Sequence, residues 1–221
     1  MIQNYSRRKL FAIPKSIQMC LLVKKYTFRY GISLKIDIIL HLKNMTNEEI
    51  RLISDYRIVI AGSTDFTNNI KTELYKSGFK SITIISSTDW YPDTVSVDMI
   101  IEYVGDCISG LKDNISIPII YPFDFVYGAG AIVIKPDDKN ELHHKSDMRF
   151  WVAEYMAGYC AFWNIEGCEW LYSALSAIRE GKTSEAALKT AAHVCARIAV
   201  NIAVNRKVKY FPKFYLCRNL D

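Results

Sequence analysis

A stretch of 30 residues decides the fold, beginning with Tyr56–Gly62 (YRIVIAG) and ending with Ser81–Ile85 (SITII). Both segments are rich in β-branched residues, which favour strands. Between them, apolar residues recur at every fourth position and share one face of a predicted helix: Phe66, Ile70 and Leu74. Gly78 suits the C-terminal cap of that helix. The stretch therefore predicts strand, loop, helix and strand, and a parallel βαβ unit is the simplest arrangement.

Three apolar runs further along the chain predict three more strands, at residues 98–104, 116–121 and 130–135. Continuous apolar runs are typical of parallel strands that are covered on both faces. We therefore expect an α/β, Rossmann-like fold with a mostly parallel sheet, helices on both faces and a helical C-terminal part. A chain of 221 residues, half of them apolar, has enough core for one main domain, which we place at residues 45–221.

Helical patterns flank the predicted sheet. Thr46, followed by acidic residues at positions 48 and 49, predicts a short capped helix before the first strand. From Asp147 the chain is mostly helical, and its first helix is apolar on nearly all sides, which is typical of a core helix or a subunit interface. A second helix is expected near residues 170–178, and a third begins near Thr183. We expect the aromatic tail, 208–221, to dock in an extended form.

The charge is unevenly distributed along the chain. Residues 1–44 hold nine of the 28 basic residues and one of the 23 acidic residues, so they carry +8 and the remainder carries −3. The basic excess therefore belongs to this leader, and we expect no nucleic-acid partner for the domain. Three interpretations of the leader stay open: a targeting segment, a real extension, or an upstream stretch of an AT-rich gene with Met45 as the natural start. We favour the third.

Two further classes are not favoured by the sequence. No apolar run approaches the ~20 residues that span a bilayer, so no membrane partner is expected. The six cysteines form no C-x-x-C pair and no short regular spacing, which argues against a disulfide framework or a four-thiolate zinc site. Reduced thiols and a cytoplasmic location are the expectation, with Cys107 and Cys217 the thiols best placed for covalent chemistry.

The loop after the first strand occupies the place where dinucleotide-binding folds bring backbone N–H groups close to phosphate. Gly62 is its one glycine, and the hydroxyls of Ser63 and Thr64 are candidate donors that compensate for the others. An ordinary strand-to-helix loop is the alternative. After the second strand, Ser86, Ser87 and Asp89 fall roughly where ribose hydroxyls are held, although a surface turn explains them equally well.

Asp106 is the acidic residue on which we place the functional hypothesis. It follows Gly105 directly after the third predicted strand, and ligands of open α/β sheets bind beyond the carboxyl ends of the strands. A carboxylate at this position is able to hold magnesium on a triphosphate. A turn or a helix cap is the alternative role.

Three other motifs are set aside. Gly181–Thr183 lacks the earlier glycine and the preceding strand that a P-loop requires. His143 and His144 have no obvious third ligand, so a solvated loop is favoured over a metal site. His193 lies in an alanine-rich helix and is expected to pack there.

The order of these segments resembles the ThiF-like, or E1-like, adenylyltransferase family. Residues 57–62 and the helix up to 78–85 look like the opening βαβ unit of that family, and residues 93–96 are similar to its segment after the second strand. Gly105-Asp106 falls where the family keeps an aspartate associated with magnesium and ATP, and residues 117–121 and 128–136 match its next strand pair. The likeness covers about 80 residues. The compact methanogen proteins of iron-guanylylpyridinol cofactor biosynthesis look most similar.

The resemblance implies ATP-dependent adenylylation of a substrate carboxylate, with Asp106 as catalytic and metal-binding residue, ATP and Mg²⁺ as cofactors, and a homodimer formed through the C-terminal helices. The carboxylate belongs to a small molecule or a carrier. The chain departs from the family by its single glycine in the first loop, a missing Asn-Arg-Gln element, a short interval between the second and third strands, and absent C-x-x-C pairs. Two alternatives stay open: a non-catalytic scaffold and a dinucleotide-binding oxidoreductase.

Overall fold

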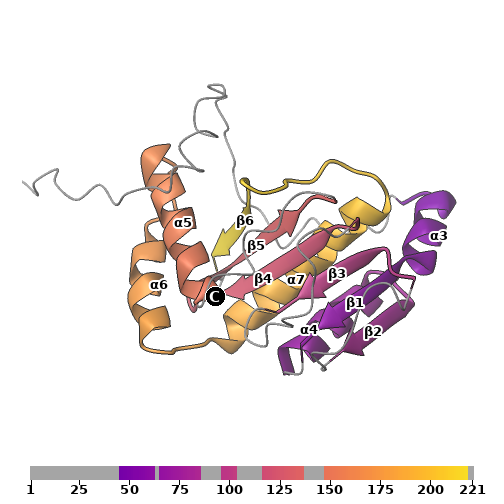
Figure 1. Cartoon of the computed structure of the whole chain (residues 1–221), viewed down its shortest axis with the longest axis horizontal. Helices are drawn as coiled ribbons and strands as arrows, with labels where there is room; N and C mark the ends of the chain where they lie inside the picture. The colour runs from indigo at the N-terminus through magenta and orange to yellow at the C-terminus, as the bar shows by residue number, and fades with distance from the viewer. Residues whose placement is uncertain (1–44, 63–64, 86–95, 104–115, 137–146, 219–221) are drawn as a thin grey trace, which may run out of the picture. The chain divides into compact units, whose positions relative to one another are not determined.

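The computed structural model describes residues 45–62, 65–85, 96–103, 116–136 and 147–218, all of which belong to one compact unit. These residues form five helices and six strands (Figure 1). In chain order the elements are α3 (Asn47–Asp55), β1 (Arg57–Ala61), α4 (Asp65–Lys76), β2 (Ser81–Ile85), β3 (Met99–Glu102), β4 (Ile119–Asp124), β5 (Gly128–Ile134), α5 (Met148–Phe162), α6 (Trp170–Arg179), α7 (Glu185–Ala203) and β6 (Tyr215–Arg218).

The strands form one sheet in the order β2-β1-β3-β4-β5-β6. Strand β1 pairs in parallel with β2 on one side and with β3 on the other, so that Val59 lies between Thr83 and Ile100. Strand β4 continues the parallel half beside β3, whereas β5 and β6 are antiparallel to their neighbours. The predicted βαβ unit and the mostly parallel α/β sheet are confirmed.

The antiparallel direction of β5 follows from the short connection after β4. Only Phe125, Val126 and Tyr127 separate the two strands, and the Phe125 amide donates to the Gly128 carbonyl oxygen at 2.9 Å. A parallel pair would need a crossover of a dozen or more residues. Val126 has a φ of +67°, which is uncommon for a β-branched residue and helps the chain to reverse.

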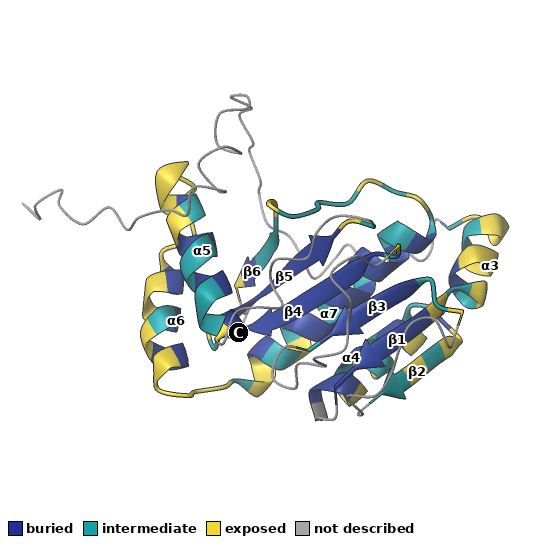
Figure 2. Ribbon diagram, in the orientation of Figure 1, coloured by how far each residue is buried: buried dark blue, intermediate teal, exposed yellow. Residues whose placement is uncertain are grey.

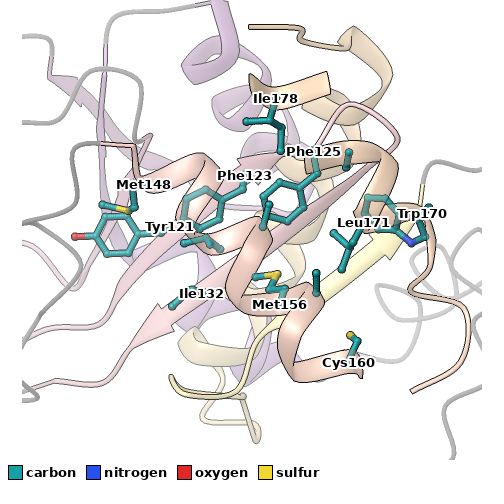
Figure 3. Packing of buried hydrophobic residues seen from close by; sticks show 14 of the residues in the cluster. Tyr121, Phe123, Phe125, Ile132, Met148, Met156, Cys160, Trp170, Leu171 and Ile178 are labelled. Carbon is teal, nitrogen blue, oxygen red and sulfur yellow. The ribbon is translucent and has the colours of Figure 1, made fainter. Parts of the chain in front are cut away.

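Helices cover both faces of the sheet. A buried cluster joins α5 and α6 to every second residue of β4 and β5 (Figure 3), including Ile119, Tyr121, Phe123, Ile132 and Ile134. Successive side chains of a strand point to opposite faces, so the residues between them face α7, which contacts both strands. Helix α4 packs against α7 and β1. Strands β1, β3, β4 and β5 are accordingly almost wholly buried, whereas β2 is half-exposed at the edge (Figure 2).

The helix ends agree with the sequence patterns, with one difference. Thr46 and Glu49 form a capping box at α3, and Gly78 follows α4 with a φ of +99°. The third C-terminal helix begins one residue later than expected, because the side chain of Ser184, and not that of Thr183, accepts a hydrogen bond from the backbone of its first turn.

The C-terminal tail docks on α5, as its aromatic content predicts. Tyr155 lies between Trp151, Phe211 and Phe214, with ring centroids 5.7, 5.7 and 6.0 Å from its own. Its hydroxyl donates to the Pro212 carbonyl oxygen at 2.6 Å. The tail then adds β6 to the edge of β5, so it covers much of the aromatic stripe that made α5 apolar on nearly all sides. None of the helices in the described parts of the chain is long and apolar enough to cross a membrane.

An ion pair joins the starts of β1 and β3. The Arg57 guanidinium donates to both carboxylate oxygens of Asp98, at 2.8 and 2.9 Å, and the Arg57 amide donates to the same carboxylate. The Asp98 amide in turn donates to the Arg57 carbonyl oxygen at 2.9 Å. The hydrogen bonds from Arg57 hold the pKa of Asp98 below its ordinary value despite some burial. The contact therefore fixes the register at the amino ends of the two strands.

The Asp98 pair predicts a pH dependence of stability. The folded-state pKa of Asp98 is lower than the unfolded-state value. The contribution of Asp98 to the free energy of unfolding is therefore present above about pH 4 and is lost as the pH falls through the folded-state pKa. Asp98→Asn should therefore lower the free energy of unfolding at pH 7, with a smaller difference from the wild type at pH 3. Urea unfolding at both pH values measures this. An equal difference at the two values would contradict it.

Two glycines with different surroundings predict opposite effects of the same substitution. A Cβ at Gly128 would overlap the Trp170 ring and lie 2.5 Å from the Cys217 carbonyl oxygen, whereas a Cβ at Gly158, within α5, would meet nothing within 4 Å. We expect Gly128→Ala to destabilise the fold by about 1–3 kcal/mol. Gly158→Ala should stabilise it by about 0.5–1 kcal/mol. Urea unfolding of both variants tests the β5–β6 packing, and a Gly128→Ala variant as stable as the wild type would contradict it.

Candidate functional site

The carboxyl ends of β1, β2 and β3 meet at one edge of the sheet, because all three strands are parallel. From β1 the chain passes through α4 to β2 on one side, and the next strand, β3, lies on the other side of β1. The strand order therefore reverses between β1 and β3. In open α/β sheets ligands bind in the crevice at such a switch point, beyond the carboxyl ends of the strands. This edge is the candidate site.

Gly62 is the first residue of the site after β1. It is buried and has a φ of +140°, a backbone conformation that residues other than glycine rarely adopt. Its amide donates to the Ile85 carbonyl oxygen at 2.9 Å and so extends the pairing of β1 with β2. Gly62 therefore turns the chain toward α4, which begins at Asp65, and its amide is already occupied by the sheet.

An aromatic pair lies where the start of α4 meets the end of β3. The rings of Phe66 and Tyr103 are in edge-to-face contact, with centroids 4.6 Å apart, and Phe66 is only 2% exposed. The Tyr103 amide donates to the Ala61 carbonyl oxygen at 3.1 Å, so the end of β3 is fixed beside the end of β1. These contacts join the start of α4 and the ends of β1 and β3 at the switch point.

Glu102 is the residue of this edge that sequence reasoning missed. It is the last residue of β3, it pairs in register with Ala61, and it is 1% exposed. Thr67, a second buried polar residue, lies in the first turn of α4. Burial of a carboxyl group is costly and recurs at functional sites. The available signal was an acid at the end of an apolar run (MIIE), which we interpreted only as part of the strand.

A second buried carboxyl group, at the end of β4, has a structural role. One carboxylate oxygen of Asp124 accepts from the Val126 amide at 2.6 Å, and the other accepts from Arg149 at 3.2 Å and from the Ser184 amide at 3.3 Å. Arg149 also donates to the backbone carbonyl oxygens of Asp124 and Lys182, both at 2.6 Å. This network joins β4, the start of α5 and the connection between α6 and α7.

The pKa of Asp124 shows the cost of this burial. Desolvation raises the pKa above its ordinary value, and the Val126 amide, the Arg149 guanidinium and the Ser184 amide offset only part of that rise. A buried ion pair of this kind is worth little net stability, although removing one partner is strongly destabilising. Because its oxygens are engaged within the protein, Asp124 is not a candidate for binding a ligand.

Most of the residues that the sequence analysis selected lie outside the described part of the chain. This group comprises Ser63, Thr64, Ser86, Ser87, Asp89, Cys107, His143, His144 and Asp106. Asp106 follows Tyr103 by three residues in the sequence. Among the described residues no group of three His, Cys, Asp or Glu side chains is arranged to hold a metal ion.

Two of the motifs that were set aside, Gly181–Thr183 and His193, lie in the described part of the chain and have ordinary structural surroundings. Gly181–Thr183 follows α6 and not a strand, as a P-loop would require. His193, on α7, lies 3.2 Å from Glu73 on α4, so it takes part in the contact between these two helices. Cys217, which the sequence analysis selected for covalent chemistry, is buried in β6, where burial raises the pKa of its thiol, and this does not favour a nucleophilic role.

A substitution at Gly62 tests whether the turn at this edge requires glycine. Gly62→Ala should destabilise the fold by about 1–3 kcal/mol, because alanine has to adopt a φ of +140° or displace the amide from Ile85. Urea unfolding measures the change. Gly158→Ala, the same substitution within a helix, serves as the control. A Gly62→Ala variant as stable as the wild type would show that the turn does not need glycine.

Comparison with known proteins adds no evidence about the role of this edge of the sheet. No protein-family model matches the chain, and no curated protein matches its sequence.

Proposed function

We propose that this chain binds ATP at the switch point between β1 and β3 and uses it to adenylylate a substrate carboxylate. The observation that carries the proposal is a buried carboxyl group, Glu102, at the end of β3, which pairs in register with Ala61 directly before the Gly62 turn. A helix that starts directly after a strand offers backbone N–H groups and a positive dipole end to an anionic ligand. The edge thus supports both the phosphates and a cation that accompanies them.

The chemistry requires positioning and charge stabilisation more than covalent participation by the protein. An oxygen of the substrate carboxylate forms a bond to the α-phosphorus of ATP, the bond from that phosphorus to the bridging oxygen of the β-phosphate breaks, and pyrophosphate leaves. The product is an acyl adenylate, whose acyl group then passes to a thiol or another nucleophile with release of AMP. The protein accelerates such a step by holding donors and charges where negative charge develops.

Each proposed binding residue has a role at this edge. The hydroxyls of Ser63 and Thr64 donate to phosphate oxygens, and Ser86, Ser87 and Asp89 hold the ribose. Asp106, with Glu102 as a second carboxyl group on the same strand and loop, holds Mg²⁺. When bound, this ion offsets the charge of the triphosphate.

The aromatic contact between Phe66 and Tyr103 is in keeping with the proposed acyl adenylate formation. The two rings pack the start of α4 against the end of β3 at the switch point, and Phe66 is almost fully buried. Exclusion of water strengthens electrostatic interactions in a site and protects a reactive intermediate from hydrolysis. An acyl adenylate is such an intermediate.

A homodimer formed through the C-terminal helices remains part of the proposal. Several large apolar residues at α5, α6 and their connection are exposed, namely Phe162, Trp163, Ile165 and Tyr172. Exposed apolar groups of this kind are typical of protein contact surfaces. The second substrate's pocket is proposed to lie in this C-terminal part.

The strand β3 offers a matched pair of substitutions, because Asp98 precedes its start and Asp106 follows its end. Asp106→Asn should lower magnesium-dependent ATP affinity and the exchange of pyrophosphate into ATP by about 10²-fold or more. Asp98→Asn, the same change at the opposite end of the strand, should leave both unchanged. Calorimetry with ATP and Mg²⁺ and a pyrophosphate exchange assay with candidate carboxylates measure the two quantities.

Three outcomes would contradict the proposal. Equal effects of the two substitutions would place the nucleotide away from the end of β3. Tight binding of a reduced nicotinamide cofactor without ATP binding would favour an oxidoreductase. Recovery of the chain in a stable complex, with no nucleotide bound by either partner, would favour a scaffold.

A further inference from the structure

A row of four aromatic rings joins the docked C-terminal tail to the exposed end of α5. The ring of Tyr159 lies between that of Phe214, with centroids 5.1 Å apart, and that of Trp163, with centroids 6.3 Å apart. Trp163 in turn contacts Phe162 edge to face, at 5.1 Å. Phe162 and Trp163 are 57% and 39% exposed. The aromatic row therefore ends in an apolar surface that faces solvent.

Charges of opposite sign flank the aromatic row. Residues 150–178, which include most of α5 and α6, hold three acidic residues and no basic one, whereas residues 186–218 hold seven basic residues and no acidic one. Glu166 is exposed in the connection between α5 and α6, and Lys213 is exposed in the tail. Desolvation and the nearby Lys213 lower the pKa of Lys209, so positive charge gathers in the tail. The row thus has a negative end at the connection and a positive end at the tail.

Both flanking charges are held in place by the backbone beside them. The Lys213 amide donates to the Tyr210 carbonyl oxygen at 2.9 Å, and the Ile165 amide, next to Glu166, donates to the Cys160 carbonyl oxygen at 2.9 Å. In the part of the chain that the structure describes, no ion pair involves Glu166 or Lys213. A partner therefore meets two fixed charges of opposite sign, and such preorganisation lowers the entropy cost of association.

We propose that Phe162, Trp163, Glu166 and Lys213 form the contact of a two-fold symmetric dimer, in which Glu166 of each copy pairs with Lys213 of the other. A two-fold contact joins the same surface on both copies. Rotation about an axis through the aromatic row exchanges its two ends, so each negative end meets the positive end of the other copy. The exposed rings are then buried between two ion pairs. This contact rests on the homodimer of the proposed function and not on its nucleotide site.

A second copy of the chain is favoured over a partner of one charge because the surface carries both signs. An acidic partner that covers the aromatic row would place like charges opposite Glu166 and the exposed Glu169, and a basic partner would do so opposite Lys209 and Lys213. Like charges across an interface are costly. A surface with the same two ends in the opposite direction matches both, and the chain itself provides it.

Charge reversal tests the proposed pairing in the full chain. Sedimentation velocity over a range of concentrations should show a dimer. Glu166→Lys alone, or Lys213→Glu alone, should raise the dissociation constant of the dimer by at least about tenfold, because each change places like charges opposite each other at two points of the contact. The double variant has both ion pairs with their partners exchanged, so its dissociation constant should return to within about threefold of the wild-type value.

Two matched controls separate this surface from the rest of the chain. Phe162→Asp should weaken the dimer by at least about tenfold, because it places a charge among the apolar residues of the contact. Ile50 is 52% exposed on α3, at the opposite end of the sheet (Figure 1), and Ile50→Asp should leave the dissociation constant within about threefold of the wild-type value. Lys207→Glu, at another exposed lysine of the tail, should do the same.

The possible failures are distinguishable. A wild-type chain that stays monomeric at all concentrations would overturn this proposal together with the homodimer. A dimer that tolerates both single charge reversals, or a double variant as weak as the single ones, would overturn the proposed pairing and leave the homodimer standing. A dimer that responds as expected but binds no ATP in calorimetry would support this contact and contradict the nucleotide site.

Discussion

The parallel pairing of β1 on both of its sides is the constraint on which the rest of the structure depends. Since β2 and β3 both run alongside β1, three carboxyl ends meet at one edge, and the strand order reverses there. The Gly62 turn, the start of α4 and the end of β3 are consequences of this pairing. The Arg57–Asp98 contact secures the same register at the opposite ends of β1 and β3.

Two buried carboxyl groups lie at the carboxyl ends of adjacent parallel strands, and their surroundings separate their roles. Asp124 accepts hydrogen bonds from Arg149 and from two backbone amides, and it therefore connects β4 to the C-terminal helices. Glu102 lies at the switch point, beside the proposed nucleotide site. Position relative to the strand reversal, and not burial alone, distinguishes a functional candidate from a structural ion pair.

The fold was largely predictable from the sequence, whereas the site was predictable only in part. Apolar runs predicted β1 and β2, and a four-residue period predicted α4, because these signals are local. The antiparallel β5 and the pairing of β6 with it depend on a tight turn and on long-range contacts that no local pattern reveals. Glu102 looked like an ordinary strand residue, because its burial at the switch point depends on the pairing of β3 with β1. Gly62 was selected for a phosphate-binding loop, and the structure shows that its amide is bonded to the Ile85 carbonyl oxygen.

The central claim, that ATP binds where the strand order reverses, is tested most directly by a crystal structure of the full chain grown with ATP and Mg²⁺. The account predicts nucleotide density at the carboxyl ends of β1 and β3, with phosphates near the start of α4 and the cation near Glu102 and Asp106. Nucleotide bound elsewhere on the protein, or an empty edge in crystals grown at saturating ATP, would contradict it.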